Sequence, residues 1–456
     1  MPAAEISVDR DPVGAGQDFA VAIRTSPVAP PATGPGPGAS YAIVLDASQS
    51  MGWAAERSSA TSRWTLALQA IRELLSQLPG RDEIQVVAFN DRAWSLCETM
   101  TVAELRTSGR LDKLDPPEYG QTDIEAGLRL AYDLLGRATA AARRAILFSD
   151  GEPNHGALTP GELGTIAEQA VRRDIYTDAV GMGAGADFEL LQAISALGST
   201  GHVTSADGSQ AVINEIVGRL ARQAQNLAAT GGELTVDVHP LFPVTGVYQV
   251  HPVNRRLSAQ VAASPDGGQR VTIPLGAVGT GDERPLFVLR LRAPEKIISR
   301  QVPIVKATGR LRTRSGVMEL DPANAAISGI AERPVVNLEQ LMVRVRAIDL
   351  EAEVAKTVKD ASPSAHADLY AEARARALRE GLTELAAEYD RALRSLRDGL
   401  DPEDLRNEQR ARSSTSTGGN PLLEARPKVD PDLVRRPEGG KRTVQRDRAV
   451  NEQDAG

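Results

Sequence analysis

The sequence predicts an α/β domain with a mostly parallel sheet and helices on both faces, combined with an antiparallel β-sandwich and an α-helical hairpin. Three changes of pattern along the 456 residues lead to this prediction. Apolar runs alternate with amphipathic stretches in residues 41–226, short β-rich runs fill residues 231–333, and a helical period returns in residues 335–402. Residues 407–456 lack aromatic side chains and are rich in Arg, Pro, Gly, Ser and Asp, so a disordered C-terminal tail is predicted there.

The N-terminal segment, residues 1–26, contains two β-like runs at 6–8 and 18–24. Residues 27–40 are dense in Pro, Ala and Gly, which excludes a helix or a central strand and indicates a linker. The two early runs have no partner in the α/β segment, so they are expected to pair with the later sandwich. The α/β domain is then either inserted in the sandwich or simply followed by it.

The α/β segment alternates strands and helices in the way typical of a parallel sheet that helices cover on both faces. The expected strands are 41–46, 83–90, 144–149, 175–181 and 202–204. The expected helices are 63–78, 123–135, 160–173, 188–197 and 209–225. A short antiparallel strand near 93–100, at the edge of the sheet, makes the sheet mixed.

The later segments change period twice. The expected strands of the sandwich are 233–238, 246–251, 257–262, 270–273, 286–291 and 302–305. After Pro334, apolar residues at steps of three and four predict two antiparallel helices, around 338–355 and 378–396, joined across residues 362–364. Their apolar stripes are expected to pack within the chain, although a coiled coil with a partner would show the same pattern.

Composition narrows the classes of function. The formal net charge of −8 argues against a general nucleic-acid-binding protein, which usually carries a basic field. Cys97 is the single cysteine, which excludes a disulfide framework and a cysteine-based zinc cluster, and it is expected to be a small buried side chain. No secretory signal is visible in the first residues given, and no uncharged apolar run approaches the roughly 20 residues of a membrane helix. We therefore expect a cytoplasmic protein that does not contact a membrane.

Oxygen-bearing side chains gather where the predicted strands end. Asp46, Ser48 and Ser50 follow the strand 41–46, and Thr122 and Asp150 lie in later loops or at a later strand end. Ligands of an open parallel sheet bind outside the carboxyl ends of its strands, so these five side chains can meet at one point. Carboxylate and hydroxyl oxygens suit a hard divalent cation such as Mg²⁺. The sequence therefore predicts a metal site with at least one open coordination position.

In these motifs the sequence resembles the von Willebrand factor A (VWA) domain family. The metal-ion-dependent adhesion site (MIDAS) of that family reads Asp-x-Ser-x-Ser, then a Thr, then an Asp. Here the pieces are DASQS at 46–50, Thr122 within GQTDIEAGL and Asp150 within FSDGEPN. The resemblance covers residues 41–225 and implies a Rossmann-like fold for this segment.

The resemblance also implies a role for each residue of the site. Ser48, Ser50 and Thr122 would coordinate the cation through their hydroxyls, while Asp46 and Asp150 would act largely through bound water. The expected cation is Mg²⁺, with Mn²⁺ or Ca²⁺ as alternatives. In this family the open position is usually taken by a Glu or Asp of a protein ligand. The expectation is therefore a metal-dependent protein-interaction module that is not an enzyme.

The flanking segments resemble bacterial proteins that combine a VWA domain with a β-sandwich and a helical segment. Some bacterial VWA proteins without a leader or anchor, including those linked to tellurium resistance, are encoded beside kinases, phosphatases or MoxR-type ATPases. This favours an intracellular scaffold or adaptor in a stress response, with such a protein or a phosphopeptide reader as its partner. Residues 413–417 and Thr443 offer hydroxyls beside basic residues, as a kinase substrate would, although any low-complexity tail would do so.

A metal-assisted hydrolase, in which the cation activates water, is the alternative function. The serines of DASQS lack the Gly-x-Ser-x-Gly elbow of hydrolases, and the candidate base, His155, is expected to be a solvated loop residue. Glu118, Asp123 and Glu152 border the site and are expected to face water. A purely structural subunit with a silent metal site is a third interpretation.

Overall fold

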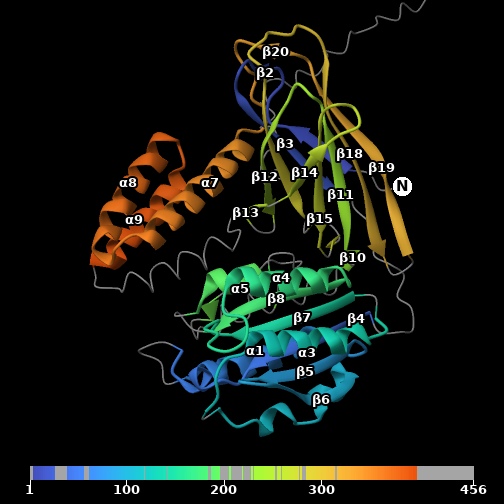
Figure 1. Cartoon of the computed structure of the whole chain (residues 1–456), viewed down its shortest axis with the longest axis vertical. Coiled ribbons are helices and arrows are strands. Elements are labelled where there is room, and N and C mark those ends of the chain that lie inside the picture. The colour runs from blue at the N-terminus through green and yellow to red at the C-terminus, as the bar shows by residue number, and fades with distance from the viewer. Residues whose placement is uncertain are drawn as a thin grey trace, which may run out of the picture.

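Figure 1 shows a computed structural model of the chain with an α/β domain, a β-sandwich beside it and a helical segment attached to the sandwich. The structure describes residues 4–25, 38–55, 61–117, 119–140, 142–182, 186–195, 205–206, 218, 227–229, 231–251, 254–257, 259–276, 278–279, 284–313 and 316–397. The expected tail, the expected strand 202–204, and most of the expected linker and of the helix 209–225 lie outside these residues.

The α/β domain is built on one six-stranded sheet in the order β6-β5-β4-β7-β8-β9. Its strands are β4 (Ala39–Asp46), β5 (Glu83–Phe89), β6 (Ala93–Thr101), β7 (Ala142–Ser149), β8 (Ile175–Met182) and β9 (Ser205–Ala206). All neighbouring strands pair in parallel except the edge strand β6, which is antiparallel to β5. The prediction of a mostly parallel sheet with an antiparallel edge strand near 93–100 is confirmed.

Helices cover both faces of this sheet because successive side chains of a strand point to opposite sides. Alternate residues of β4, such as Ile43 and Leu45, share a buried cluster with α1 (Arg63–Gln77) and α2 (Val102–Thr107). The residues between them, such as Val44, share a cluster with α3 (Ile124–Gly136), α4 (Pro160–Val171) and α5 (Phe188–Ser195). The short helix α2 was not predicted from the sequence, and its start has a capping box formed by Thr101 and Glu104.

The sandwich consists of two five-stranded antiparallel sheets whose apolar faces form one buried cluster. The first sheet has the order β1 (Ala4–Val8), β3 (Asp18–Thr25), β17 (Leu286–Arg292), β12 (Val244–His251) and β13 (Arg255–Arg256). The second has the order β14 (Gln260–Ala263), β15 (Gln269–Leu275), β11 (Gly231–Val238), β18 (Val302–Thr313) and β19 (Gly316–Ile327). Two small pairs complete it: β2 (Val13–Gly14) with β20 (Ile330–Ala331), and β10 (Leu227–Ala229) with β16 (Val278–Gly279).

The pairing of β3 with β17 decides between the two arrangements that the sequence left open. It runs antiparallel from Arg24 opposite Leu286 to Asp18 opposite Arg292. The early strands therefore belong to the sandwich, and the α/β domain is inserted in it. The expected single strand 257–262 is wrong, because the chain passes there from β13 in one sheet to β14 in the other.

In its described residues the helical segment contains three α-helices instead of the two that the sequence predicts. They are α7 (Glu339–Asp360), α8 (His366–Arg379) and α9 (Thr383–Arg397), and the predicted break across 362–364 separates the first two. Gly381 makes the second break with a φ of +74°, in the left-handed region that favours glycine. The amide of Leu382 then donates to the carbonyl of Ala377 at 2.8 Å, which closes the end of α8.

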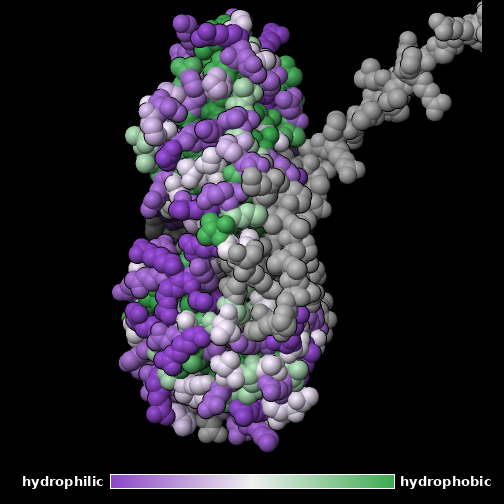
Figure 2. All heavy atoms as spheres, turned by 90° about the vertical axis from the view of Figure 1, so that its right-hand side faces the viewer, coloured by the Kyte–Doolittle hydropathy of each residue, from purple (hydrophilic) through white to green (hydrophobic). Residues whose placement is uncertain are grey.

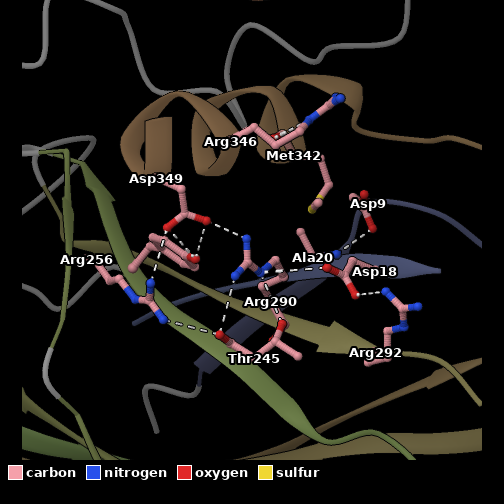
Figure 3. A network of polar contacts seen from close by, with 11 residues as sticks. Asp9, Asp18, Ala20, Thr245, Arg256, Arg290, Arg292, Met342, Arg346 and Asp349 are labelled. Carbon is pink, nitrogen blue, oxygen red and sulfur yellow. Dashed lines mark hydrogen bonds and ion pairs between the residues drawn. The ribbon is translucent and has the colours of Figure 1, made fainter. Parts of the chain in front are cut away.

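α7 joins this segment to the outer face of the first sheet of the sandwich. Leu341, Val345 and Ile348 pack on apolar side chains of β3, β12 and β17. Figure 3 shows Asp349 of the same helix facing Arg290 and Arg256 of the sandwich. The joint therefore combines an apolar contact with a polar network at its side.

Tyr248 and Asp349 form the centre of this network. The Tyr248 hydroxyl donates to the two carboxylate oxygens of Asp349 at 3.0 and 2.9 Å, and Arg290 donates to the same carboxylate. The guanidinium carbons of Arg290 and Arg256 lie 5.6 and 6.0 Å from the centroid of the Tyr248 ring. Burial and the negative charge of Asp349 raise the pKa of Tyr248, so the phenol remains a hydrogen-bond donor.

The outer surface is mainly hydrophilic on the side that Figure 2 shows, with hydrophobic residues in small scattered groups. Cys97 is buried and free, as expected. Among the described residues, no helix is both long enough and apolar enough to cross a membrane.

Replacing Asp349 with Ala should loosen α7 from the sandwich, because it removes the hydrogen-bond acceptor of a buried phenol and of Arg290, and the ion-pair partner of Arg256. We expect a loss of about 2–4 kcal/mol in the free energy of unfolding. Denaturant titration and hydrogen exchange of the amides of α7 measure it. Glu372→Ala, an exposed change on α8, is the control. Unchanged stability and exchange in Asp349→Ala would show that the apolar contact alone holds the helix.

Candidate metal centre

The turn after β4 brings three of the predicted residues together. Asp46 ends β4, is fully buried, and accepts a hydrogen bond at Oδ1 from the backbone amide of Ser48 at 2.9 Å. The hydroxyl oxygens of Ser48 and Ser50 lie 3.2 Å apart. Ser50 lies in the short 3₁₀ helix η1 (Gln49–Gly52), which turns the chain so that both hydroxyls approach one point.

Asp150 directly follows the neighbouring strand β7 and is also fully buried. Between the two acids, the hydroxyl of Ser149 donates to Oδ2 of Asp46 at 2.6 Å. Burial and the nearby charge of Asp150 raise the pKa of Asp46 to about 7, against the hydrogen bonds from Ser149 and Ser48. The two carboxylates therefore need positive charge close by if both are to be ionised.

Thr122 is buried in a loop that contacts both of the other loops of the site. Its amide donates to the side chain of Asn154 at 2.8 Å, and its carbonyl accepts from the amides of Asn154 and His155 at 3.1 and 3.2 Å. On the other side, the amide of Gln49 donates to the carbonyl of Gly120 at 3.3 Å. The three loops that carry the predicted residues thus form one connected edge.

Arg63 supplies a positive charge to the site that was not predicted from the sequence. It is the first residue of α1, and its Nη1 donates to Oδ2 of Asp150 at 2.6 Å. The side chain is 12% exposed, so this ion pair is largely shielded from water. Its backbone amide donates to the carbonyl of Trp53 at 3.0 Å, which ties α1 to the η1 turn. No local sequence signal marks this pair, because 87 positions separate Arg63 from Asp150.

The residues at this edge fit a hard divalent cation. Two buried carboxylates and two hydroxyls 3.2 Å apart are the oxygen donors that Mg²⁺ prefers, and Thr122 lies in the adjoining loop. In the part of the chain that the structure describes, no cluster of three or more His, Cys, Asp or Glu side chains could hold a metal. A metal site among these residues must therefore use hydroxyl ligands.

One residue at the border of the site differs from its prediction. Asp123, expected to face water, is 8% exposed and caps α3 by accepting from the amide of Ala126 at 2.9 Å. Its other oxygen lies 3.0 Å from Nδ1 of His155. Asp123 is held there because the unpaired amides at a helix start attract an acid to this position. His155 is an exposed loop residue, as expected, with the carboxylate of Asp123 as its neighbour. Glu152 is exposed, as expected, and Glu118 lies outside the described residues.

Comparisons with known proteins give a family match within the α/β domain and structural matches over most of the chain. Residues 41–152 match the family model described as von Willebrand factor type A domain. The structure is similar to a von Willebrand factor type A protein from Catenulispora acidiphila, with a TM-score of 0.69, 14% identity, and coverage of 91% of this chain and 97% of that one. It is also similar to the ArnB paralog VWA2 from Sulfolobus acidocaldarius, with a TM-score of 0.54, 14% identity, and coverage of 92% and 100%.

A search of curated protein sequences finds no match to this chain. The two solved structures are too distant in sequence to show more than a shared fold, but that fold extends over nearly the whole chain. The family match covers the segment that contains β4, β5, β6 and β7 together with the loops of the candidate site. The α/β domain of this chain is a von Willebrand factor type A domain.

Proposed function

We propose that this chain is a metal-dependent protein-interaction module that binds an acidic residue of a protein partner at the carboxyl edge of its VWA domain. Domains of this family are general protein-interaction and adhesion modules. The observation that carries the proposal is the pair of buried carboxylates, Asp46 and Asp150, beside the facing hydroxyls of Ser48 and Ser50. With Thr122, these residues would hold Mg²⁺, which would supply a positive coordination site for a carboxylate.

The hydrogen bonds of the two acids support the division of roles that the family pattern implies. Both oxygens of Asp46 already accept hydrogen bonds, from the amide of Ser48 and the hydroxyl of Ser149. One oxygen of Asp150 accepts from Arg63. Both carboxylates are thus suited to supply negative charge without contacting the metal directly, through bound water. The serine hydroxyls are suited to be direct ligands.

The charge balance of the site supports an acidic partner. When both are ionised, Asp46 and Asp150 exceed the single charge of Arg63 by one negative charge. A divalent cation reverses the sign and leaves one excess positive charge. A single carboxylate of a partner then neutralises the site, whereas a basic side chain would be repelled.

We further propose that the protein acts as a cytoplasmic adaptor of bacterial type. Its partner would be a kinase, a phosphatase, a phosphopeptide reader or a MoxR-type ATPase, and no catalytic residue is assigned. The alternative, a metal-assisted hydrolase, is favoured by one observation. Asp123 lies 3.0 Å from Nδ1 of His155, as an acid does when it orients a catalytic base. Metal-dependent turnover of phosphate or carboxylate esters that is lost in His155→Ala would establish it.

The double variant Ser48→Ala with Ser50→Ala should bind Mg²⁺ at least roughly tenfold more weakly, because it removes two direct oxygen ligands. Isothermal titration calorimetry on the full chain measures the affinity. Ser76→Ala, an exposed serine on α1, is the matched control. An unchanged affinity in the double variant would place the metal elsewhere.

Partner binding should depend on the same site. Wild-type chain immobilised on a resin should capture its partner from a lysate of the source cells in Mg²⁺, and both EDTA and the double serine variant should abolish the capture. Identification of the captured proteins by mass spectrometry, with Ser76→Ala in parallel, checks this. Capture of the same proteins under all conditions would contradict the proposal.

Arg63→Gln should tighten Mg²⁺ binding by roughly tenfold, because it removes a positive charge that competes for Asp150. Arg63→Lys keeps the charge and should stay close to the wild type. Calorimetric titration of Mg²⁺ into the three proteins compares them. A weaker affinity in Arg63→Gln would instead show that the guanidinium holds Asp150 in the geometry that the metal needs.

A further inference from the structure

The α/β domain exposes three large apolar side chains among its described residues, and all three lie on the loops of the candidate site. Trp53, Tyr119 and Leu158 are 57%, 77% and 51% exposed. Each comes from a different loop: the one that ends η1, the one that precedes α3, and the one between β7 and α4. Other large apolar side chains described in this domain are buried or partly buried. Their gathering at one edge therefore requires an explanation.

The loops of Trp53 and Tyr119 touch each other. A Cβ atom built on Gly52, the neighbour of Trp53, would lie 2.8 Å from the carbonyl oxygen of Pro117, two residues before Tyr119. The carbonyl of Trp53 accepts from the amide of Arg63, the residue that pairs with Asp150. The backbone at both aromatic residues is therefore positioned by contacts with residues of the candidate site and its loops.

Leu158 lies on the loop between β7 and α4, and its backbone is also fixed. Its amide donates to Oε2 of Glu162, in the capping box at the start of α4, at 3.2 Å. The preceding amide, of Ala157, donates to Oε2 of Glu125 on α3 at 3.0 Å. Because the backbone is anchored while the side chain faces water, little conformational entropy is lost when a partner covers Leu158.

We propose that Trp53, Tyr119 and Leu158 form an apolar rim around the candidate site, and that the partner is a protein segment carrying bulky apolar side chains next to its acidic residue. This inference rests on the proposed function and adds the chemistry of the partner to it. Tryptophan and tyrosine are enriched among the residues that dominate protein interfaces. The excess positive charge of the metal-loaded site selects the carboxylate, and the apolar rim selects its neighbours.

An anionic lipid surface is the other occupant that exposed aromatic residues could meet. The net charge of −8 and the exposed Glu152 beside the site oppose it, since both repel lipid phosphates. A protein segment that brings a single carboxylate meets less of this repulsion than a surface of many phosphates. The observations therefore favour the protein segment.

Immobilised decapeptides with a central Glu, flanked either by Leu, Phe and Trp or by Ser and Asn, test the rim in Mg²⁺. The wild-type chain should bind the apolar-flanked set at least roughly tenfold more tightly, and Trp53→Ala with Tyr119→Ala should lose that preference. Leu241→Ala with Val317→Ala, a pair of exposed apolar residues in the sandwich, is the matched control. Calorimetry with Mg²⁺ alone shows whether the metal site of each variant is intact.

The outcomes separate the rim from the proposed function. Mg²⁺-dependent binding with no preference for apolar flanks, or a preference that survives in the aromatic double variant, overturns the rim and leaves the proposed function standing. Binding that persists in EDTA, or with Gln at the centre, overturns the proposed function. The rim is also overturned if the wild type binds none of the peptides, or if the double variant loses Mg²⁺ affinity and peptide affinity equally. Trp53-dependent binding to phosphatidylserine vesicles overturns it too.

Discussion

Two buried carboxylates at the ends of adjacent parallel strands are the constraint on which the candidate site depends. β4 and β7 pair in parallel, so Asp46 and Asp150 leave the sheet at the same edge. Burial and mutual repulsion raise the pKa of Asp46 to about 7, so ionising both acids is unfavourable. Neighbouring hydrogen-bond donors offset part of this unfavourable energy. Ser149 donates to one acid and Arg63 to the other. The same electrostatic demand makes the site receptive to a cation.

The sandwich holds the opposite edge of the α/β sheet. Tyr176, at the start of β8, donates its hydroxyl to the carbonyl of Leu275 at 3.4 Å, and Asp174 just before it pairs with Arg312 at the tip of the long β18–β19 hairpin. Because parallel strands begin at one edge and end at the other, these contacts lie away from the loops of the candidate site. The insertion thus fixes the domain by its amino edge and keeps its carboxyl edge available.

The sheet and the oxygen ligands could be predicted because their signals are local. Apolar runs of strand length and polar residues directly after them are visible within a few positions, as at Asp46 and Asp150. The Arg63 pair could not be predicted, since its geometry arises only when α1 packs beside β7. The break at Gly381 depends on a single residue within a nearly continuous helical pattern. The role of Asp123 as a helix cap was overlooked, although an acid before an apolar helix is itself a local signal.

Charge and apolar surface have different consequences for recognition at this edge. A site that offers only an excess positive charge would accept any exposed Glu or Asp, because Coulomb attraction has little shape and is screened by salt. Burying apolar area adds about 25 cal/mol per Å², so covering the exposed part of an aromatic ring of 150–250 Å² contributes on the order of 2–3 kcal/mol. That corresponds to roughly a hundredfold in affinity. In the proposed complex the metal would set which charge can bind, and Trp53, Tyr119 and Leu158 would set which of the many carboxylates in a cell does.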